Sequence, residues 1–299
     1  MGVLEGRVAV ITGAGNGIGR AYALRFAREG AKLVVNSVQP GADGTDASSS
    51  AGVVAAEIRA AGGDAEVHVG SVSEWDQGKR LIDLAIDAYD RVDVLVNNAG
   101  FLRDKLIVNM AEDDWDAVLD VHLKGQFVPL RFAGEHWRAR SKAGETFHAS
   151  VINTTAGAGL HGNVGQANYG AAKAGAAALT VIAAREMQRF GVHVNAISPL
   201  ARTRQLETVA ALAETIRKPD DPTVFDQFDP DNITPLAVHL ASEACRVTGQ
   251  VFHVFAGKIG VYQGWRVAEP FERDRRWTVD EIAEALAHLP TDPPPFDPG

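Results

Sequence analysis

A glycine-rich turn between the first predicted strand and the first predicted helix restricts the fold more than any other feature of the chain. The segment reads Thr-Gly-Ala-Gly-Asn-Gly-Ile-Gly over residues 12–19, and it follows an apolar run at residues 8–11. Glycines permit a tight turn there, and the helix N-terminus behind them presents free N–H groups to a diphosphate. We therefore expect a dinucleotide-binding βαβ unit, with a tight turn that binds nothing as the alternative.

The rest of the chain alternates short apolar runs with amphipathic helical stretches. This pattern predicts an α/β fold, a Rossmann-type doubly wound parallel sheet of about seven strands with helices on both faces. Strands are expected at residues 8–11, 33–35, 65–69, 92–96, 151–153, 192–197 and 251–255. Helices are expected at residues 18–28, 53–61, 75–89, 113–139 (as one long helix), 169–189 and 278–288. Irregular segments are expected at residues 39–52 and 200–232, and a long irregular insertion is typical of a lid.

The pattern divides the chain into a main domain and an extension. Residues 1–262 are expected to form the Rossmann domain, and residues 263–299 an extension that packs on it. Thr278 caps the predicted helix of the extension, with Glu281 three residues later. The Pro-rich segment 290–299 is expected to be disordered.

Composition excludes several classes of function. A net charge of −9 over 299 residues does not favour nucleic acid or an anionic membrane as partner. No apolar run is long enough to span a bilayer, and the N-terminus does not resemble a signal peptide. The single cysteine, Cys245, excludes an intramolecular disulfide, and no metal-binding cluster is expected. A cytoplasmic location and a small-molecule substrate are the resulting expectations.

Three motifs together resemble those of the short-chain dehydrogenase/reductase family. They are Gly-x-x-x-Gly-x-Gly at residues 13–19, Asn-Asn-Ala-Gly at residues 97–100 and Tyr-x-x-x-Lys at residues 169–173. The resemblance extends from about residue 4 to residue 260. It implies a nicotinamide cofactor, NAD or NADP, and an oxidoreductase that interconverts a secondary alcohol and a ketone. The cofactor-binding residues that it implies in the first two motifs are Gly13, Asn16, Gly17, Ile18, Gly19, Asn98, Ala99 and Gly100.

Tyr169 and Lys173 are four residues apart on one predicted helix, so they share a face. A free phenol has a pKa of about 10, and a nearby ammonium favours the phenolate and lowers that value. The pair is therefore suited to general acid–base catalysis on an alcohol or a carbonyl. The resemblance implies that Tyr169 exchanges the hydroxyl proton while Lys173 also binds the nicotinamide ribose. A surface pair without a catalytic role is the alternative.

The sequence departs from the family pattern at two catalytic positions. Ala156 stands thirteen residues before Tyr169, where the family has a serine that binds the substrate oxygen. Thr155 is a candidate replacement if the loop shifts. His122 stands where the family has an asparagine on the preceding helix. It is either a support for a water-mediated proton path or a buried structural histidine.

The adenosine end of the predicted cofactor site departs from the pattern as well. Ser37 occupies the place of the acidic residue that binds the ribose diol, and Gly70 occupies the place of a second acid. A serine does not repel a 2′-phosphate, but no adjacent base attracts one, so NAD and NADP both remain open. The resemblance places Pro199 beside the nicotinamide ring and Thr203 at its carboxamide.

The substrate side of the predicted cleft is apolar. The residues expected to face the substrate are Ala156, Leu160, His161 and Leu200. Residues 121–125, 165–169 and 257–260 resemble the dehydrogenase part of peroxisomal multifunctional enzymes and its actinobacterial relatives. This resemblance implies a hydroxyacyl, steroid-like or polyketide-like substrate. Because Ala156, Ser37 and Gly70 all depart from the family pattern, non-redox chemistry such as cyclisation or dehydration, with Tyr169 as acid–base group, is an alternative. A catalytically weak subunit of an oligomer is a further alternative. The two long predicted helices imply a homodimer or homotetramer, as in the family.

Overall fold

The computed structural model describes residues 2–39, 41–42, 44–203, 214–265, 267 and 271–290. Its centre is an eight-stranded sheet in the order β3-β2-β1-β4-β5-β6-β7-β8, in which the strands from β1 to β7 are parallel and β8 is antiparallel to β7. The strands are β1 (Val8–Ile11), β2 (Lys32–Ser37), β3 (Asp64–Val69), β4 (Val94–Asn97), β5 (Ala149–Thr154), β6 (Val192–Leu200), β7 (Val251–Phe255) and β8 (Lys258–Val261). The predicted doubly wound α/β fold is confirmed, with β8 as an additional edge strand.

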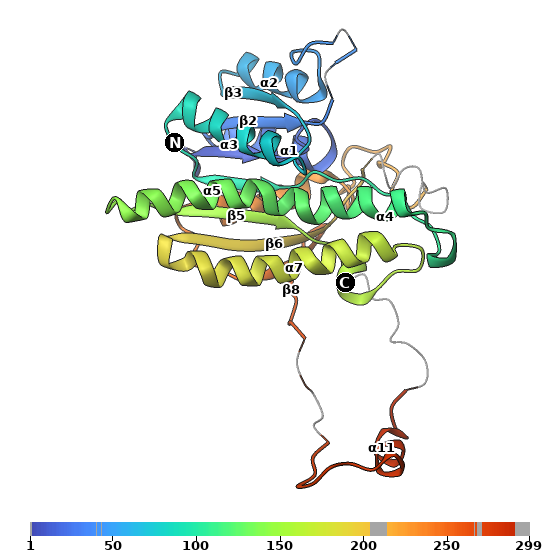
Figure 1. The fold of residues 1–299 in the computed structure, drawn as a ribbon. Coiled ribbons are helices and arrows are strands. Elements are labelled where there is room, and N and C mark those ends of the chain that lie inside the picture. Colours follow the sequence, from blue (N-terminus) through green and yellow to red (C-terminus); the bar gives the residue numbers. More distant parts are fainter. Residues whose placement is uncertain are drawn as a thin grey trace.

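Helices cover both faces of the sheet. One face carries α3 (Trp75–Tyr89), α5 (Gly125–Lys142) and α7 (Ala167–Met187), which lie in front of the strands in Figure 1. The opposite face carries α1 (Gly17–Arg28), α2 (Ser50–Ala60) and α10 (Thr234–Ala241). The other helices are α4 (Glu112–Leu119), α6 (Gly157–His161), α11 (Val279–Leu286) and the short turns η1 (Ile107–Asn109), η2 (Asp120–Lys124), η3 (Gln188–Phe190) and η4 (Pro230–Ile233).

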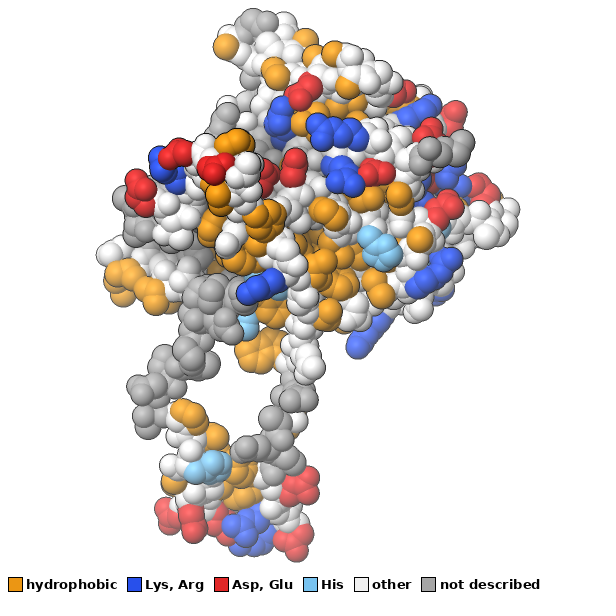
Figure 2. Space-filling view, turned by 180° about the vertical axis from the view of Figure 1, so that it is seen from behind, with side chains coloured by type: hydrophobic (Ala, Val, Ile, Leu, Met, Phe, Trp, Pro, Cys, Tyr) orange, Lys and Arg blue, Asp and Glu red, His pale blue; other side chains and the backbone are white. Residues whose placement is uncertain are grey.

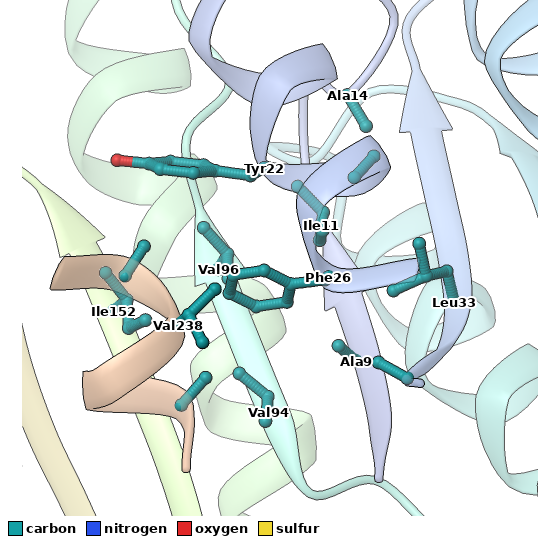
Figure 3. Close-up of a cluster of buried hydrophobic side chains, with 14 of the residues drawn as sticks. Ala9, Ile11, Ala14, Tyr22, Phe26, Leu33, Val94, Val96, Ile152 and Val238 are labelled. Atoms are coloured by element: carbon teal, nitrogen blue, oxygen red, sulfur yellow. The ribbon is translucent and has the colours of Figure 1, made fainter. Parts of the chain in front are cut away.

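The apolar strands β1 and β4 lie at the centre of the sheet and are buried on both faces. On the face of α1, Figure 3 shows the ring of Phe26 lying beside Val96 and Val238, while Tyr22 extends from the same helix. Both aromatic side chains are fully buried. Burial of a large apolar side chain contributes roughly 1.5–3 kcal/mol. This packing holds α1 with its N-terminus at the carboxyl ends of β1 and β4, where the glycine turn lies.

One predicted helix is interrupted in the structure. The segment 113–139, which we expected to be a single helix, contains α4, the π-helical turn η2 and α5. A π-helical turn inserts one extra residue, and such turns are frequent at functional sites. Periodicity read from the sequence does not detect a single inserted residue, so the turn that carries His122 was missed. The elements α6, α10 and β8 were not predicted either, and α2 begins at Ser50, capped by Ser49.

The C-terminal extension contains the predicted short helix, α11. Thr278 and Glu281 form the expected capping box at its start. Figures 1 and 2 show α11 apart from the sheet and its helices, with hydrophobic and charged side chains both on its surface. The division at residue 262, with the extension packed on the same domain, stays a prediction. The segment expected to be disordered lies, apart from residue 290, outside the described residues, as does 204–213 of the predicted lid. In the described part of the chain, no helix combines the length and the apolar character that a membrane-spanning helix needs.

Candidate active site

A cleft of about 860 Å³ opens at the carboxyl ends of the parallel strands. Ligands of doubly wound folds bind at this edge of the sheet. The cleft brings together most of the residues singled out in the sequence, which are Gly13, Asn16, Gly17, Ile18, Gly19, Ser37, Asn98, Ala99, Gly100, His122, Thr155, Ala156, Tyr169, Lys173, Pro199, Leu200 and Thr203. Leu160 and His161 do not line it. They lie on α6 and line a neighbouring pocket of about 580 Å³.

The glycine turn is shaped for close backbone contact. Gly13 and Gly17 have φ angles of +63° and +52°, which favour glycine. A Cβ atom on Gly13 would lie 2.7 Å from the Cα of Ala99, and one on Gly19 would lie 2.2 Å from the carbonyl oxygen of Gly13. Asn16 caps α1 without a side-chain hydrogen bond to the first-turn N–H groups. The turn therefore leaves an open cradle at a helix N-terminus, which fits a diphosphate.

The loop after β4 is joined to this turn by Thr12. The hydroxyl oxygen of Thr12 accepts hydrogen bonds from the backbone N–H groups of Asn98 (2.9 Å) and Ala99 (3.1 Å). The side-chain amide of Asn98 donates in return to the carbonyl oxygens of Thr12 and Gly13. The first two motifs thus form one hydrogen-bonded unit at the centre of the cleft.

Asn36, at the end of β2, is a site residue that the sequence analysis missed. Its side-chain oxygen accepts a hydrogen bond from Gly13 N–H, and its amide donates to the carbonyl oxygen of Gly70 (3.0 Å). A buried asparagine directly after an apolar strand was the signal that could have identified it. Ser37 and Gly70 line the cleft beside it, and no carboxylate lines the cleft in the described part of the chain. The adenosine end therefore has neither of the two acids typical of the family pattern.

Tyr169 and Lys173 face the same cleft from α7. The ammonium nitrogen of Lys173 lies 5.6 Å from the centre of the Tyr169 ring and donates to the carbonyl oxygen of Thr154 at 2.7 Å. Burial lowers the pKa of Lys173 to about 7, and burial together with Asp104 raises the pKa of the Tyr169 phenol. The expected lowering of the phenol pKa by the ammonium is therefore outweighed by desolvation. Both groups favour their neutral forms.

The carbonyl that Lys173 contacts is held by Asn97, from the Asn-Asn-Ala-Gly motif, and by two residues that the sequence analysis missed, Gln126 and Asn153. Asn97 donates to the side-chain oxygen of Asn153 at 2.9 Å, and to the carbonyl oxygen of Gln126. The side-chain amide of Gln126 donates in turn to the carbonyl oxygen of Thr154 at 2.9 Å. This buried network connects β4, β5 and α5 and fixes the acceptor of the lysine.

Thr155 is not available to replace the missing serine. Its side chain is fully buried, and its hydroxyl donates to the carbonyl oxygen of Lys173 at 2.7 Å. Ala156 lines the cleft in an extended conformation directly before α6. The substrate oxygen therefore has no hydroxyl partner at position 156, and Thr155 instead supports the helix turn of Lys173.

His122 lies in the π-helical turn and contacts Tyr169. Its ring meets the Tyr169 ring edge to face, with 4.9 Å between the ring centres. Its Nε2 atom lies 2.6 Å from the carbonyl oxygen of Phe101. Burial, and next the charge of Lys173, lowers the pKa of His122 to about 3, so the imidazole is neutral at neutral pH.

Much of the cleft lining is apolar. Arg202 holds part of this lining in place. Its backbone N–H donates to the carbonyl oxygen of Phe228 (2.7 Å), and its guanidinium donates to the carbonyl oxygen of Ile216 (2.6 Å). Arg202 also forms an ion pair with Asp226. The apolar side chains of the cleft include Leu102, Val121, Leu200, Ile216 and Phe228. In the described residues, no group of His, Cys, Asp and Glu side chains could hold a metal ion.

Comparisons with known proteins agree with this geometry. The family model described as short chain dehydrogenase matches residues 7–211. The chain is 39% identical to the hydroxyacyl-CoA dehydrogenase ChsB1 of Mycobacterium tuberculosis, over 95% of this chain and 88% of that protein. It is 38% identical to the mouse peroxisomal multifunctional enzyme type 2, over 91% of this chain but only 34% of that longer protein. A crystal structure of a short chain dehydrogenase from Mycobacterium avium matches with a TM-score of 0.88 and 46% identity, over 99% of both chains.

Proposed function

The chain belongs to the short-chain dehydrogenase family, and we propose that within it the protein is a hydroxyacyl-CoA dehydrogenase. The reaction would oxidise the secondary alcohol of a hydroxyacyl thioester to a ketone, or run in reverse. The observation that carries the proposal is the placement of Tyr169 and Lys173 in one cleft with a glycine cradle and a largely apolar lining. The similarity to ChsB1 over 95% of this chain supports the substrate class.

A nicotinamide dinucleotide fits the residues of the cleft. The cradle of Gly13, Gly17 and Gly19 and the N-terminus of α1 would hold its diphosphate, and Ser37 would face its adenosine ribose. Thr203 and Pro199 would border the nicotinamide. When bound, such a cofactor supplies the acceptor or donor of a hydride.

Tyr169 would manage the proton of the substrate. In ketone reduction, a phenol whose pKa is raised remains protonated at neutral pH and donates its proton to the developing alkoxide. In alcohol oxidation the phenolate is needed, so a higher pH favours that direction. Lys173, in its charged form, would stabilise the phenolate from the position fixed by Thr154.

Binding of both cofactors and turnover of hydroxyacyl thioesters test the proposal directly. We expect saturable quenching of protein fluorescence by NADH or NADPH, and reduction of NAD or NADP when a hydroxyacyl-CoA is added.

The loss of the serine at position 156 favours a second candidate function, which is non-redox acid–base chemistry by Tyr169. Absence of binding by either cofactor, together with binding of an acyl thioester, would favour that candidate and contradict the proposal.

Restoring the serine is expected to increase the rate of oxidation. An Ala156→Ser substitution would place a hydroxyl donor in the cleft, where it can stabilise charge on the substrate oxygen. Removing one such donor from an enzyme typically lowers kcat by a factor of 10²–10³. We expect the restored hydroxyl to recover part of this factor, which is a gain in kcat of about tenfold. Steady-state kinetics with a hydroxyacyl-CoA measure the effect, and Ala143→Ser, at an exposed helix end, is the matched control. An unchanged or lower kcat would contradict this expectation.

Introducing an acid at position 37 is expected to change the cofactor preference. Ser37→Asp would place a carboxylate at the end of β2, where it binds a ribose diol and repels a 2′-phosphate. We expect the ratio of the NADPH and NADH dissociation constants to rise by at least about tenfold, which corresponds to about 1.4 kcal/mol. Fluorescence titration measures both constants. Ser37→Asn, which adds no charge, should leave the ratio nearly unchanged; an equal shift in both variants would rule out the charge effect.

We also propose a homodimer or homotetramer that pairs through α4, α5 and α7. Three large side chains on these helices, Trp115, Phe127 and Ile182, are exposed in the single chain, which supports an interface there. Light scattering after size-exclusion chromatography measures the assembly. A small-molecule substrate and a cytoplasmic location stay predictions from the sequence.

A further inference from the structure

His122 connects three parts of the candidate active site. It belongs to the π-helical turn η2, its ring edge contacts Tyr169 on α7, and its Nε2 atom contacts the backbone of Phe101 in the loop after β4. The side chain is 3% exposed. Because the π-helical turn inserts one residue between α4 and α5, it is the element that brings this side chain to the phenol.

The ring is anchored to the backbone through one nitrogen. Nε2 lies 2.6 Å from the carbonyl oxygen of Phe101, and the backbone N–H of Phe101 is directed at the same nitrogen at 3.0 Å. Nε2 donates to the carbonyl in one tautomer and accepts from the N–H in the other, so either neutral form of the ring keeps a hydrogen bond to Phe101. Nδ1 has no hydrogen-bond partner in the described part of the protein.

The environment opposes the addition of a second proton to the neutral ring. Burial and the neighbouring Lys173 both disfavour an imidazolium, as the lowered pKa of His122 reflects. A group that resists protonation in this way is a poor carrier of protons between neutral solvent and the substrate.

Gly100 shows how closely the ring is fitted. A Cβ atom on Gly100 would lie 2.2 Å from the Cε1 atom of His122 and 2.9 Å from its Nδ1 atom. The absence of a side chain at this position, the last of the Asn-Asn-Ala-Gly motif, therefore leaves the space that the imidazole fills. A methyl group there would push the ring away from its contacts.

We propose that His122 is a positioning residue. Its uncharged ring packs against Gly100 and against Tyr169, and so sets the orientation of the Tyr169 phenol in the cleft. The inference rests on the proposed function, because the orientation matters only if the phenol exchanges a proton with substrate. In this role the shape of the ring is required and its protonation is not. A phenylalanine ring loses the contact with the Phe101 backbone but keeps the shape, so it should retain most of the function, whereas an alanine should not.

Three variants separate positioning from proton transfer. We expect His122→Phe to keep kcat within about threefold, and His122→Ala to lower it about tenfold with little change in cofactor dissociation constant. Gly100→Ala should lower kcat about tenfold in the presence of His122, and should cause no further loss when combined with His122→Ala. Two residues that act through one contact show such non-additivity. Gly257→Ala, at a glycine with open space around it, is the matched control.

Several results would overturn the proposal. They are equal losses in His122→Phe and His122→Ala, additive losses in the double variant, or unchanged kcat in all variants. Thermal unfolding and cofactor quenching establish that each variant is folded. If the unaltered protein oxidises no alcohol, the proposed function fails separately. A crystal structure of Gly100→Ala then tests the inference alone, since a displaced His122 with a turned Tyr169 ring supports it and an unmoved Tyr169 ring contradicts it.

Discussion

Replacement of Tyr169 by Phe is expected to lower kcat for hydroxyacyl-CoA oxidation by about 10³-fold, within the 10²–10⁴ range of general acid–base catalysis. The substitution removes the phenol oxygen that we propose as the proton-exchanging atom, but it keeps the ring that packs edge to face against His122. The cradle around Gly13 is untouched, so the dissociation constant of the cofactor should change less than about threefold. Steady-state kinetics and fluorescence titration measure the two quantities.

The pH dependence of the oxidation rate of the unaltered protein provides a second test of the Tyr169 phenol. Because the pKa of Tyr169 is raised, its phenolate fraction increases about tenfold with each pH unit above 7, and oxidation should accelerate with pH. Tyr89→Phe, which removes a surface hydroxyl bonded to Asp64, is the matched control. A Tyr169→Phe variant with near-normal kcat would contradict the assignment of the phenol as the proton-exchanging group.

The sequence predicted the sheet and most of the cleft because both depend on local patterns. Apolar runs and glycine turns locate the strands, and parallel strands carry their carboxyl ends to one edge. This is why residues as distant in sequence as Gly13 and Tyr169 could be expected in one cleft. The edge strand β8 was missed because its four residues are all exposed, which leaves no buried alternation to detect.

The failures at the site arise from side-chain geometry, which a sequence motif does not contain. Thr155 was a candidate donor to the substrate, but its hydroxyl is bonded to the carbonyl of Lys173. Leu160 and His161 were expected at the substrate, but the helix α6 carries them to the adjoining pocket. Asn36 was missed because its role depends on register, which sets it beside both Gly13 and Gly70.

The sequence also could not show how strongly Tyr169 and Lys173 are desolvated. Spacing places an ammonium near a phenol and predicts mutual stabilisation of their charged forms. The structure buries Lys173 to 1% exposure, and burial opposes charge on both groups. An amine buried for function should therefore reduce the stability of the fold.

Replacement of Lys173 by Met is accordingly expected to stabilise the folded protein at pH 7 while it abolishes most activity. Burial lowers the pKa of Lys173 from 10.5 to about 7, a difference of about 3.5 units. At about 1.36 kcal/mol per unit this corresponds to at most about 4–5 kcal/mol of lost stability. Met has a similar length and no desolvation cost. The Thr154 carbonyl that loses the ammonium keeps its bond from Gln126, so we expect a net gain of about 2–4 kcal/mol.

The sign of the pH dependence makes this prediction specific. Between pH 7 and 10.5 the unfolded chain binds more protons at position 173 than the folded protein does, so the stability of the unaltered protein rises with pH. The advantage of Lys173→Met should therefore shrink to within about 1 kcal/mol near pH 10. Guanidinium unfolding of both proteins at pH 7 and pH 10 measures it, with Lys142→Met at an exposed helix end as control. A Met variant that is less stable at pH 7, or an advantage that does not change with pH, would show that the amine is not desolvated as the geometry of the cleft requires.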